Sequence, residues 1–295
     1  KINRRFEGIG WWQLVISFVI SVYYAAVIAW ALSYAVFSIN LKWGDDTSGF
    51  LFGEYLKLAD TPGDFGGIVP GVFIPLVIVW LATLFILYSG VKKGIEVANK
   101  VMLPALFVLF TILVIRALTL DGAAEGLNAF FKPNWDSILN GKVWVAAYSQ
   151  IFFSLSIGFA IMVTYSSYLG KKSDITNNAF ITGFANSGFE LLAGIGVFSI
   201  LGFMAMQQGV AVDEVVSGGV GLAFVVFPQI INQLPALNGF FGFLFFGSLV
   251  LAGMTSLISI VGSFLPTSLI TLKPASSARL IALFRNSLGI VMVPS

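Results

Sequence analysis

The sequence contains no cysteine and no histidine among its 295 residues. Their absence excludes disulfide frameworks, the usual zinc sites and the catalytic triads or proton relays that use these side chains. Charged residues make up only 10% of the chain, whereas soluble domains carry about 25%. The net charge of +2 and the dispersed basic residues do not provide a nucleic-acid surface. These shortages exclude most enzyme classes and nucleic-acid partners.

Apolar residues are correspondingly abundant, at 58% of the chain, with a mean hydropathy of +0.93. A membrane core of about 30 Å is crossed by roughly 20 apolar residues in a helix, because unpaired backbone groups are not tolerated in lipid. The sequence therefore predicts an all-α integral membrane protein, with residues 1–265 forming one transmembrane helical domain in the lipid bilayer. Six spans are expected, near residues 9–39, 72–90, 98–118, 143–169, 178–206 and 237–265.

The loops between these spans differ in charge. Acidic residues such as Asp45 and Asp121 lie in loops on one side, and most of the 16 basic residues, including Lys93 and Lys172, fall on the other. Because Lys and Arg accumulate in cytoplasmic loops, we expect a multi-pass protein of the plasma (inner) membrane. The amino terminus of this segment is then cytoplasmic.

Two regions are not predicted to be membrane-spanning helices. Residues 207–236 contain short apolar runs around a glycine-rich turn, which fits either an extracellular two-helix loop folded into a vestibule or an interfacial hairpin. Residues 266–295 form an atypical tail in which the only apolar stretch is too short to cross a membrane. We expect either a truncated end or a cytoplasmic or interfacial segment.

The fourth expected span is interrupted by small and hydroxylated residues, in the run QIFFSLSIGF at residues 150–159. One interpretation is that these residues only allow close helix packing. The other is a broken helix, whose unwound centre offers carbonyl groups to cations and a half-helix N-terminus to an anionic group.

Other polar residues also lie at mid-span. Asn186 and Glu190 are one helical turn apart in the fifth span, and an ionisable residue inside a membrane is a functional candidate by default. The run AGMTS at residues 252–256 brings hydroxyl groups into the sixth span. Such oxygen atoms suit hard cations such as sodium, although a single Ser or Thr more commonly bonds to its own helix. Tyr23 and Tyr24 lie at mid-depth in the first span, where a tyrosine hydroxyl needs a polar partner. Two alternatives remain for each of them: simple packing, or donation of its hydroxyl to a carboxylate.

These residues resemble the neurotransmitter:sodium symporter family, in particular its bacterial amino-acid transporters. The run QIFFSLS followed by Gly158 and Phe159 is a specific signature of that family, and KGIE at residues 93–96 supports it. The similarity extends over residues 5–266 and corresponds to the third to eighth spans of the family. It implies a partial inverted-repeat sodium symporter, or leucine-transporter-like, fold with a broken helix in the fourth span of this chain.

The resemblance also implies a site. By their match to family positions, the residues expected to bind substrate are Ile20, Tyr24, Phe153, Ser154, Ser156, Phe159, Ser256 and Ile260. Those expected to bind the first sodium ion are Ser154 and Asn186, and those expected to bind the second are Ala252, Thr255 and Ser256. Glu190, with Gln150 beside it, falls where chloride-dependent members bind chloride. The glutamate would supply that negative charge itself.

We therefore expect part of a sodium-coupled symporter for a hydrophobic or aromatic amino acid, not an enzyme, with sodium ions as the required ligands. The first two spans of the family have no counterpart in the sequence, so we expect this segment alone to be inactive without the missing helices of its parent protein. The alternative is a membrane scaffold or sensor with the same fold that does not transport. The exact substrate, ion stoichiometry, any proton counter-transport and the oligomeric state are left open by the sequence.

Overall fold

The computed structural model describes residues 7–59, 61, 66–170, 172–215 and 219–265, and these residues form helices without any β-strand. Five helical segments are long and apolar enough to cross a membrane. They contain the long helices α1 (Glu7–Phe37), α3 (Pro70–Tyr88), α4 (Glu96–Leu118), α8 (Ile175–Gln208) and α12 (Asn238–Phe264). The all-helical membrane architecture predicted from composition is confirmed. The expected tail at 266–295 lies outside the described residues.

The region expected as a span at 143–169 consists of two shorter helices. They are α6 (Gly141–Ser154) and α7 (Ala160–Tyr168). Neither has the roughly 20 residues that a crossing requires. For this reason the described residues contain five long apolar helices where the sequence predicted six continuous spans.

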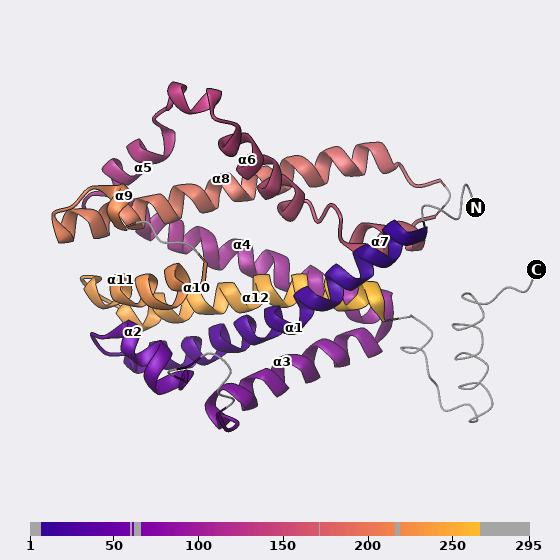
Figure 1. Ribbon diagram of the computed structural model, residues 1–295, viewed down its shortest axis with the longest axis horizontal. Helices are drawn as coiled ribbons and strands as arrows, with labels where there is room; N and C mark the ends of the chain where they lie inside the picture. Colours follow the sequence, from indigo (N-terminus) through magenta and orange to yellow (C-terminus); the bar gives the residue numbers. More distant parts are fainter. Residues whose placement is uncertain (1–6, 60, 62–65, 171, 216–218, 266–295) are drawn as a thin grey trace, which may run out of the picture.

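Short elements connect these helices. They are η2 (Ser38–Asn40), α2 (Thr47–Gly49), η3 (Phe50–Tyr55), η4 (Val91–Ile95), α5 (Ala123–Phe131), η5 (Trp135–Leu139), α9 (Val212–Val215), α10 (Gly219–Gly221), η6 (Leu222–Val226) and α11 (Phe227–Gln233). The expected loop at 207–236 thus contains one short helix and one longer helical stretch, Gly219–Gln233. We call the end of the bundle that carries α2, η3 and this stretch the loop end; it lies at the left of Figure 1.

The centre of the bundle is the contact between α1 and α12, which is the most extensive contact between two elements. The helices approach closely because small residues line the contact. A Cβ atom added to Gly253 would lie only 2.6 Å from Cγ1 of Ile28, and Ala25 and Ala29 are fully buried. Helices α3 and α4 pack on this central pair, as Figure 1 shows.

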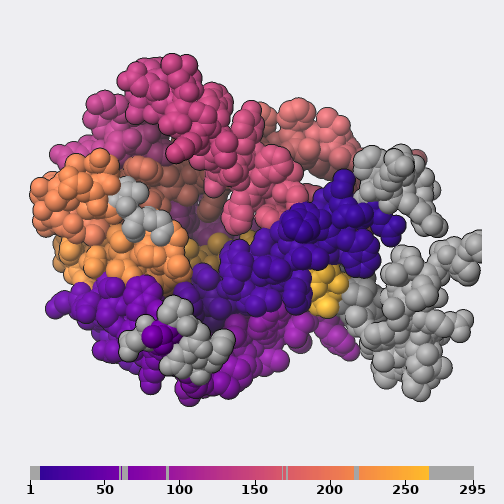
Figure 2. Space-filling view, in the orientation of Figure 1, coloured from indigo at the N-terminus to yellow at the C-terminus, as the bar shows by residue number. Residues whose placement is uncertain are grey.

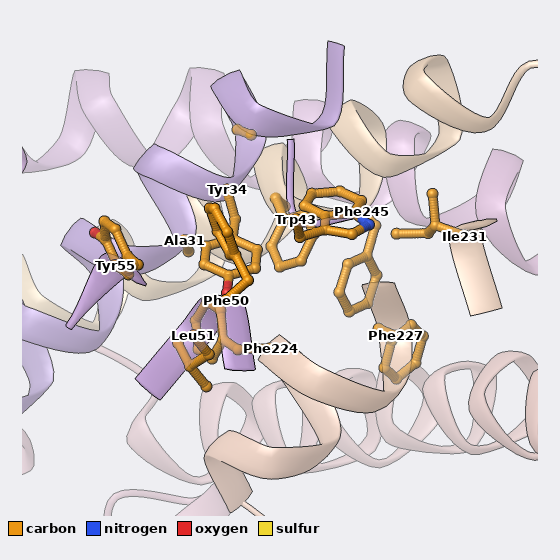
Figure 3. Packing of buried hydrophobic residues seen from close by; sticks show 12 residues of the cluster. Ala31, Tyr34, Trp43, Phe50, Leu51, Tyr55, Phe224, Phe227, Ile231 and Phe245 are labelled. Carbon is orange, nitrogen blue, oxygen red and sulfur yellow. The ribbon is translucent and has the colours of Figure 1, made fainter. Parts of the chain in front are cut away.

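An aromatic cluster closes the loop end. The Tyr34 ring at the end of α1 stacks on Trp43, with 5.6 Å between centroids, and meets the edge of Phe224 at 5.1 Å (Figure 3). The Trp43 indole N–H donates a 2.9 Å hydrogen bond to Oδ1 of Asn232, whose Nδ2 donates to the carbonyl of Gly44 at 2.7 Å. These contacts fasten the 219–233 stretch to the end of α1.

Glycine also sets the position of α8. Its second half packs against α5, and a Cβ atom added to Gly202 would lie 2.8 Å from Cα of Gly126. The backbones of α8 and α5 are therefore in direct contact, and a side chain at either glycine would keep the two helices further apart. The first half of α8 and residues 141–153 of α6 are largely exposed. Apolar side chains such as Val145 and Phe152 thus face away from the described bundle.

Candidate functional site

The site begins at the gap between α6 and α7. Helix α6 ends at Ser154, residues 155–159 are not helical, and α7 begins at Ala160. Two residues in the gap have positive φ angles, Ser156 at 54° and Gly158 at 85°. A left-handed conformation suits glycine but costs a residue such as serine about 1 kcal/mol or more. The interruption therefore stores some backbone strain, as residues near functional sites often do.

Contacts with two other helices hold α7 in place after the gap. The backbone N–H of Ala160 donates to Oγ of Ser17 on α1 at 3.3 Å, and Ser17 is fully buried. The hydroxyl groups of Tyr165 on α7 and Ser259 on α12 lie 2.6 Å apart and share a hydrogen bond. The start of α7 is thus positioned by α1 and its middle by α12.

A cavity of about 810 Å³ lies beside the gap. Residues of α1, α4, α6, α7, α8 and α12, of the gap and of the 219–224 region line it. The surface in Figure 2 is hollowed between α6 and α1. All eight residues expected to bind substrate line this cavity: Ile20, Tyr24, Phe153, Ser154, Ser156, Phe159, Ser256 and Ile260.

The cavity wall is mostly apolar with a polar side. The rings of Phe153 and Phe159, from the two ends of the gap, meet edge to face at 6.1 Å between centroids. Ile20 and Ile260 add aliphatic surface from α1 and α12. Such a wall suits an apolar ligand with few polar groups.

The polar side of the cavity includes residues of α1 and α12. Tyr24 of α1 and Ser256 of α12 both line the cavity. Nearby on α12, the Thr255 hydroxyl donates to the Ala252 carbonyl at 2.8 Å. Thr255 and Ser256 line the cavity, whereas Ala252 does not. The three residues expected at the second sodium ion therefore lie within five consecutive positions of α12, and two of them line the cavity.

A second polar cluster joins α6 to α8. Nδ2 of Asn186 donates to Oγ of Ser154 at 2.6 Å and to Oε1 of Glu190 at 3.3 Å. The Ser154 hydroxyl also donates to Oε1 of Glu190. The structure thus joins three of the predicted residues in one hydrogen-bonded group. Ser154 and Asn186 line the cavity, while Glu190 and Gln150 do not.

The polar side chains that line the cavity are hydroxyls and amides, all of them neutral. Among the described residues, no three Asp or Glu side chains come together as a multivalent metal site would require. Hydroxyl, amide and carbonyl oxygens suit a monovalent hard cation instead. The donors of both polar clusters fit sodium in this respect.

Sequence reasoning missed several polar residues of the site. Asn99, Tyr165, Thr182 and Ser259 also line the cavity, and Ser17 anchors α7. Ser259 could have been found from its place one turn after Thr255 and Ser256. Asn99 and Ser17 gave no signal in the sequence, because single polar residues in a span are common.

Known proteins resemble the chain over most of its length. A sequence profile described as the Sodium:neurotransmitter symporter family matches residues 1–49 and 45–292. An uncharacterized sodium-dependent transporter of Methanocaldococcus jannaschii is 41% identical over 261 residues, covering 88% of this chain and 53% of the relative. The sodium- and chloride-dependent GABA transporter 2 of Homo sapiens is 33% identical, with 93% of this chain and 50% of the relative covered.

A solved structure resembles the chain as well. It is the crystal structure of MhsT in complex with L-phenylalanine, with a TM-score of 0.73 and 30% identity, covering 98% of this chain and 61% of that one. The two sequence relatives are named as transporters, in agreement with the prediction that the chain is not an enzyme. The chain spans about half the length of the curated relatives it matches.

Proposed function

Because the chain belongs to the sodium:neurotransmitter symporter family, we propose that it forms about half of a sodium-coupled amino-acid symporter of the plasma membrane. The observation that carries this proposal is the cavity of about 810 Å³ beside the gap between α6 and α7. Aromatic rings and oxygen donors from several helices meet there. A cavity next to a broken helix is where transporters of this kind bind substrate and ions.

The proposed substrate is a hydrophobic or aromatic amino acid. Ile20, Phe153, Phe159 and Ile260 would surround its side chain, and the Tyr24 hydroxyl would donate to its carboxylate. In support, these five residues line one cavity, and the similar structure of MhsT contains L-phenylalanine. Ser156 and Ser256 would complete the pocket wall.

Two sodium sites are proposed beside the substrate. Ser154 and Asn186 would bind one ion together with the substrate carboxylate, and Ala252, Thr255 and Ser256 would bind the other. Because the carboxylate is itself a ligand of the first ion, each would raise the affinity for the other by the same factor. Sodium moving down its gradient would then drive amino-acid uptake.

Glu190 would supply a fixed negative charge to the first sodium site. Its carboxylate oxygen accepts hydrogen bonds from both proposed sodium ligands, Ser154 and Asn186. With this charge present, the transporter would not need chloride. Gln150, one turn before Ser154 on α6, would lie on the same side of the helix.

The proposal is tested by uptake of radiolabelled L-phenylalanine into proteoliposomes that contain the full-length protein. Uptake should be driven by an inward sodium gradient and should be lost when potassium replaces sodium on both sides. Equal uptake in potassium alone would contradict sodium coupling. Binding and uptake both absent, with the protein correctly folded, would instead favour the non-transporting scaffold.

A further inference from the structure

Helix α7 packs on the bundle with one face only. Ile161 on this face is 6% exposed, whereas Met162 and Val163 on the other face are 48% and 62% exposed. Residues 155–159 before α7 are not helical and include two positive φ angles. A few residues of this kind can absorb the backbone change when a rigid element moves. The contacts of its packed face therefore decide whether α7 lies against α12.

Polar contacts join the packed face of α7 to α12. The Tyr165 hydroxyl lies 2.6 Å from Oγ of Ser259, and Oγ1 of Thr164 lies 3.4 Å from the Ser263 carbonyl. The second distance is long for a hydrogen bond between oxygen atoms, and the Thr164 hydroxyl also donates to the Ala160 carbonyl of its own helix at 2.9 Å. Of these two contacts with α12, the one made by Tyr165 is therefore the stronger.

The direction of the Tyr165 bond follows from the second contact of Ser259. A serine hydroxyl has one hydrogen atom, and Ser259 donates it to the Thr255 carbonyl at 3.0 Å. The Tyr165 hydroxyl is then the donor, and Oγ of Ser259 is the acceptor. Hydrogen bonds in such a chain strengthen one another. The chain runs from α7 to Thr255, which is a proposed ligand of the second sodium ion.

Helix α7 also forms a wall of the larger cavity beside that ion site. Ile161 and Tyr165 line the cavity together with Thr255 and Ser256. We call this arrangement, with α7 against α12, the closed one. If α7 moved away from α12, water would enter and compete with the ion for its oxygen ligands. The attraction between ion and ligands would also weaken, because water raises the local dielectric constant.

We propose that Tyr165 is a positioning residue for the second sodium site, and that its bond to Ser259 keeps α7 closed. This inference rests on the proposed function, since it requires sodium to bind at Thr255 and Ser256. Sodium would bind the closed arrangement more tightly than the open one and would shift the equilibrium toward it. Loss of the Tyr165 hydroxyl would shift the equilibrium toward the open arrangement and lower the apparent affinity for sodium.

Cysteine labelling of the full-length protein tests the proposal. This chain contains no cysteine, so Ile161→Cys adds one thiol on the packed face of α7, in a full-length background without other cysteines. The reagent is methanethiosulfonate ethyltrimethylammonium, and choline replaces sodium at constant ionic strength. Two quantities are measured: the labelling rate without sodium and the sodium concentration that gives half-maximal protection. The wild-type sequence in this background should be protected by sodium.

Tyr165→Phe should change these two quantities in a linked way. Labelling needs the open arrangement and sodium binding needs the closed one. The fold-increase in rate multiplied by the fold-increase in sodium concentration therefore equals the change in the opening equilibrium constant. For the loss of one hydrogen bond this product should be about three- to tenfold. Ser259→Ala should give a similar product, and the double variant should add little, because both changes remove the same bond.

Tyr88→Phe is the matched control, because Tyr88 at the end of α3 is 62% exposed and does not line the cavity. It should leave both quantities unchanged. A product of one for Tyr165→Phe and Ser259→Ala, or labelling that sodium does not slow, overturns the proposal. If one of these variants does not fold, the other decides. Failure of the proposed function would appear separately, as uptake of L-phenylalanine by the wild type that does not depend on sodium.

Discussion

At the residue scale, the contacts of Asn186 combine two proposed roles in one side chain. Its amide reaches Ser154 on α6 and Glu190 one turn further along α8. The amide oxygen is a hard donor suited to sodium, while the amide nitrogen holds the neighbouring oxygens in place. Removal of the side chain would therefore take away one proposed sodium ligand and also one of the two hydrogen bonds that Ser154 makes in this cluster.

We expect Asn186→Ala to raise the sodium concentration needed for half-maximal substrate binding by about tenfold or more. Mutation of a residue that only hydrogen-bonds to a metal ligand already lowers metal affinity about 10- to 100-fold, and Asn186 is proposed to be a ligand itself. Scintillation proximity binding of labelled L-phenylalanine across a sodium titration measures this in the full-length protein. Ser187→Ala is the control, because Ser187 is the next residue on α8 and does not line the cavity. An unchanged sodium dependence in Asn186→Ala would remove this residue from the site.

The Glu190 carboxylate leads to a second prediction at this scale. Glu190→Ser removes the negative charge beside Ser154 and Asn186, so a chloride ion should then be required to balance sodium. Uptake by this variant should fall strongly when gluconate replaces chloride, whereas wild-type uptake should not. Glu214→Ser, which removes an acidic residue of α9, should behave as the wild type. Equal uptake by Glu190→Ser in both salts would show that the carboxylate does not replace chloride.

At the scale of elements, glycine contacts fix the helix that carries Asn186. Helix α8 can lie against α5 only because Gly202 and Gly126 have no side chains at the contact. The contact is between backbone atoms, so rotation of a side chain cannot relieve an added methyl group. The placement of α8 thus depends on single glycine residues.

Gly202→Ala should destabilise the protein by about 1–3 kcal/mol, as overpacking of a close contact does. The midpoint of thermal unfolding of the full-length protein in detergent reports this loss. Gly247→Ala is the matched control on α12, because an added Cβ at Gly247 meets no atom within 4 Å. Equal midpoints for the two variants would mean that the α5–α8 contact tolerates a side chain.

The 219–233 stretch depends on polar contacts as well as on rings. Asn232 bonds to the Trp43 indole and to the Gly44 carbonyl. Asn232→Ala removes both bonds and leaves a buried indole N–H without this acceptor, at a cost of about 1–3 kcal/mol. Hydrogen exchange of the backbone amides in 222–233 should become faster, while Gln233→Ala, an exposed neighbour, should leave it unchanged. Unchanged exchange in Asn232→Ala would show that the contacts of the aromatic cluster are sufficient to hold the 219–233 stretch in place.

At the scale of the whole molecule, burial is uneven. The α1–α12 contact and the loop end are tightly packed, whereas residues 141–153 of α6 are exposed throughout. This chain covers only 53% and 50% of the two sequence relatives. We infer that further helices of the parent protein cover α6 and complete the cavity.

The isolated chain should consequently show no sodium-dependent heat on addition of L-phenylalanine in isothermal titration calorimetry. The full-length protein should show such heat, because only there would all ligands of the cavity be present. Circular dichroism confirms that the isolated chain is helical before it is used. Sodium-dependent binding by the isolated chain alone would show that these helices are sufficient.

Much of the fold could be predicted from local sequence. A long apolar run determines a helix by itself, because backbone groups in lipid bond only within their own segment. The gap after α6 also had a local signal, since Ser154, Ser156 and Gly158 interrupt an apolar run. The division of the expected fourth span into α6 and α7 follows from these residues.

What the sequence could not determine was which residues meet. Nothing local to Ser17 indicates that it accepts a hydrogen bond from Ala160, 143 positions away, and nothing near Tyr165 indicates that its hydroxyl meets Ser259, 94 positions away. Amino-acid type and spacing therefore set the helices, the break and the kinds of donor available. Packing of distant helices alone decided which donors share a cavity, because convergence in space depends on helix contacts and not on position in the chain.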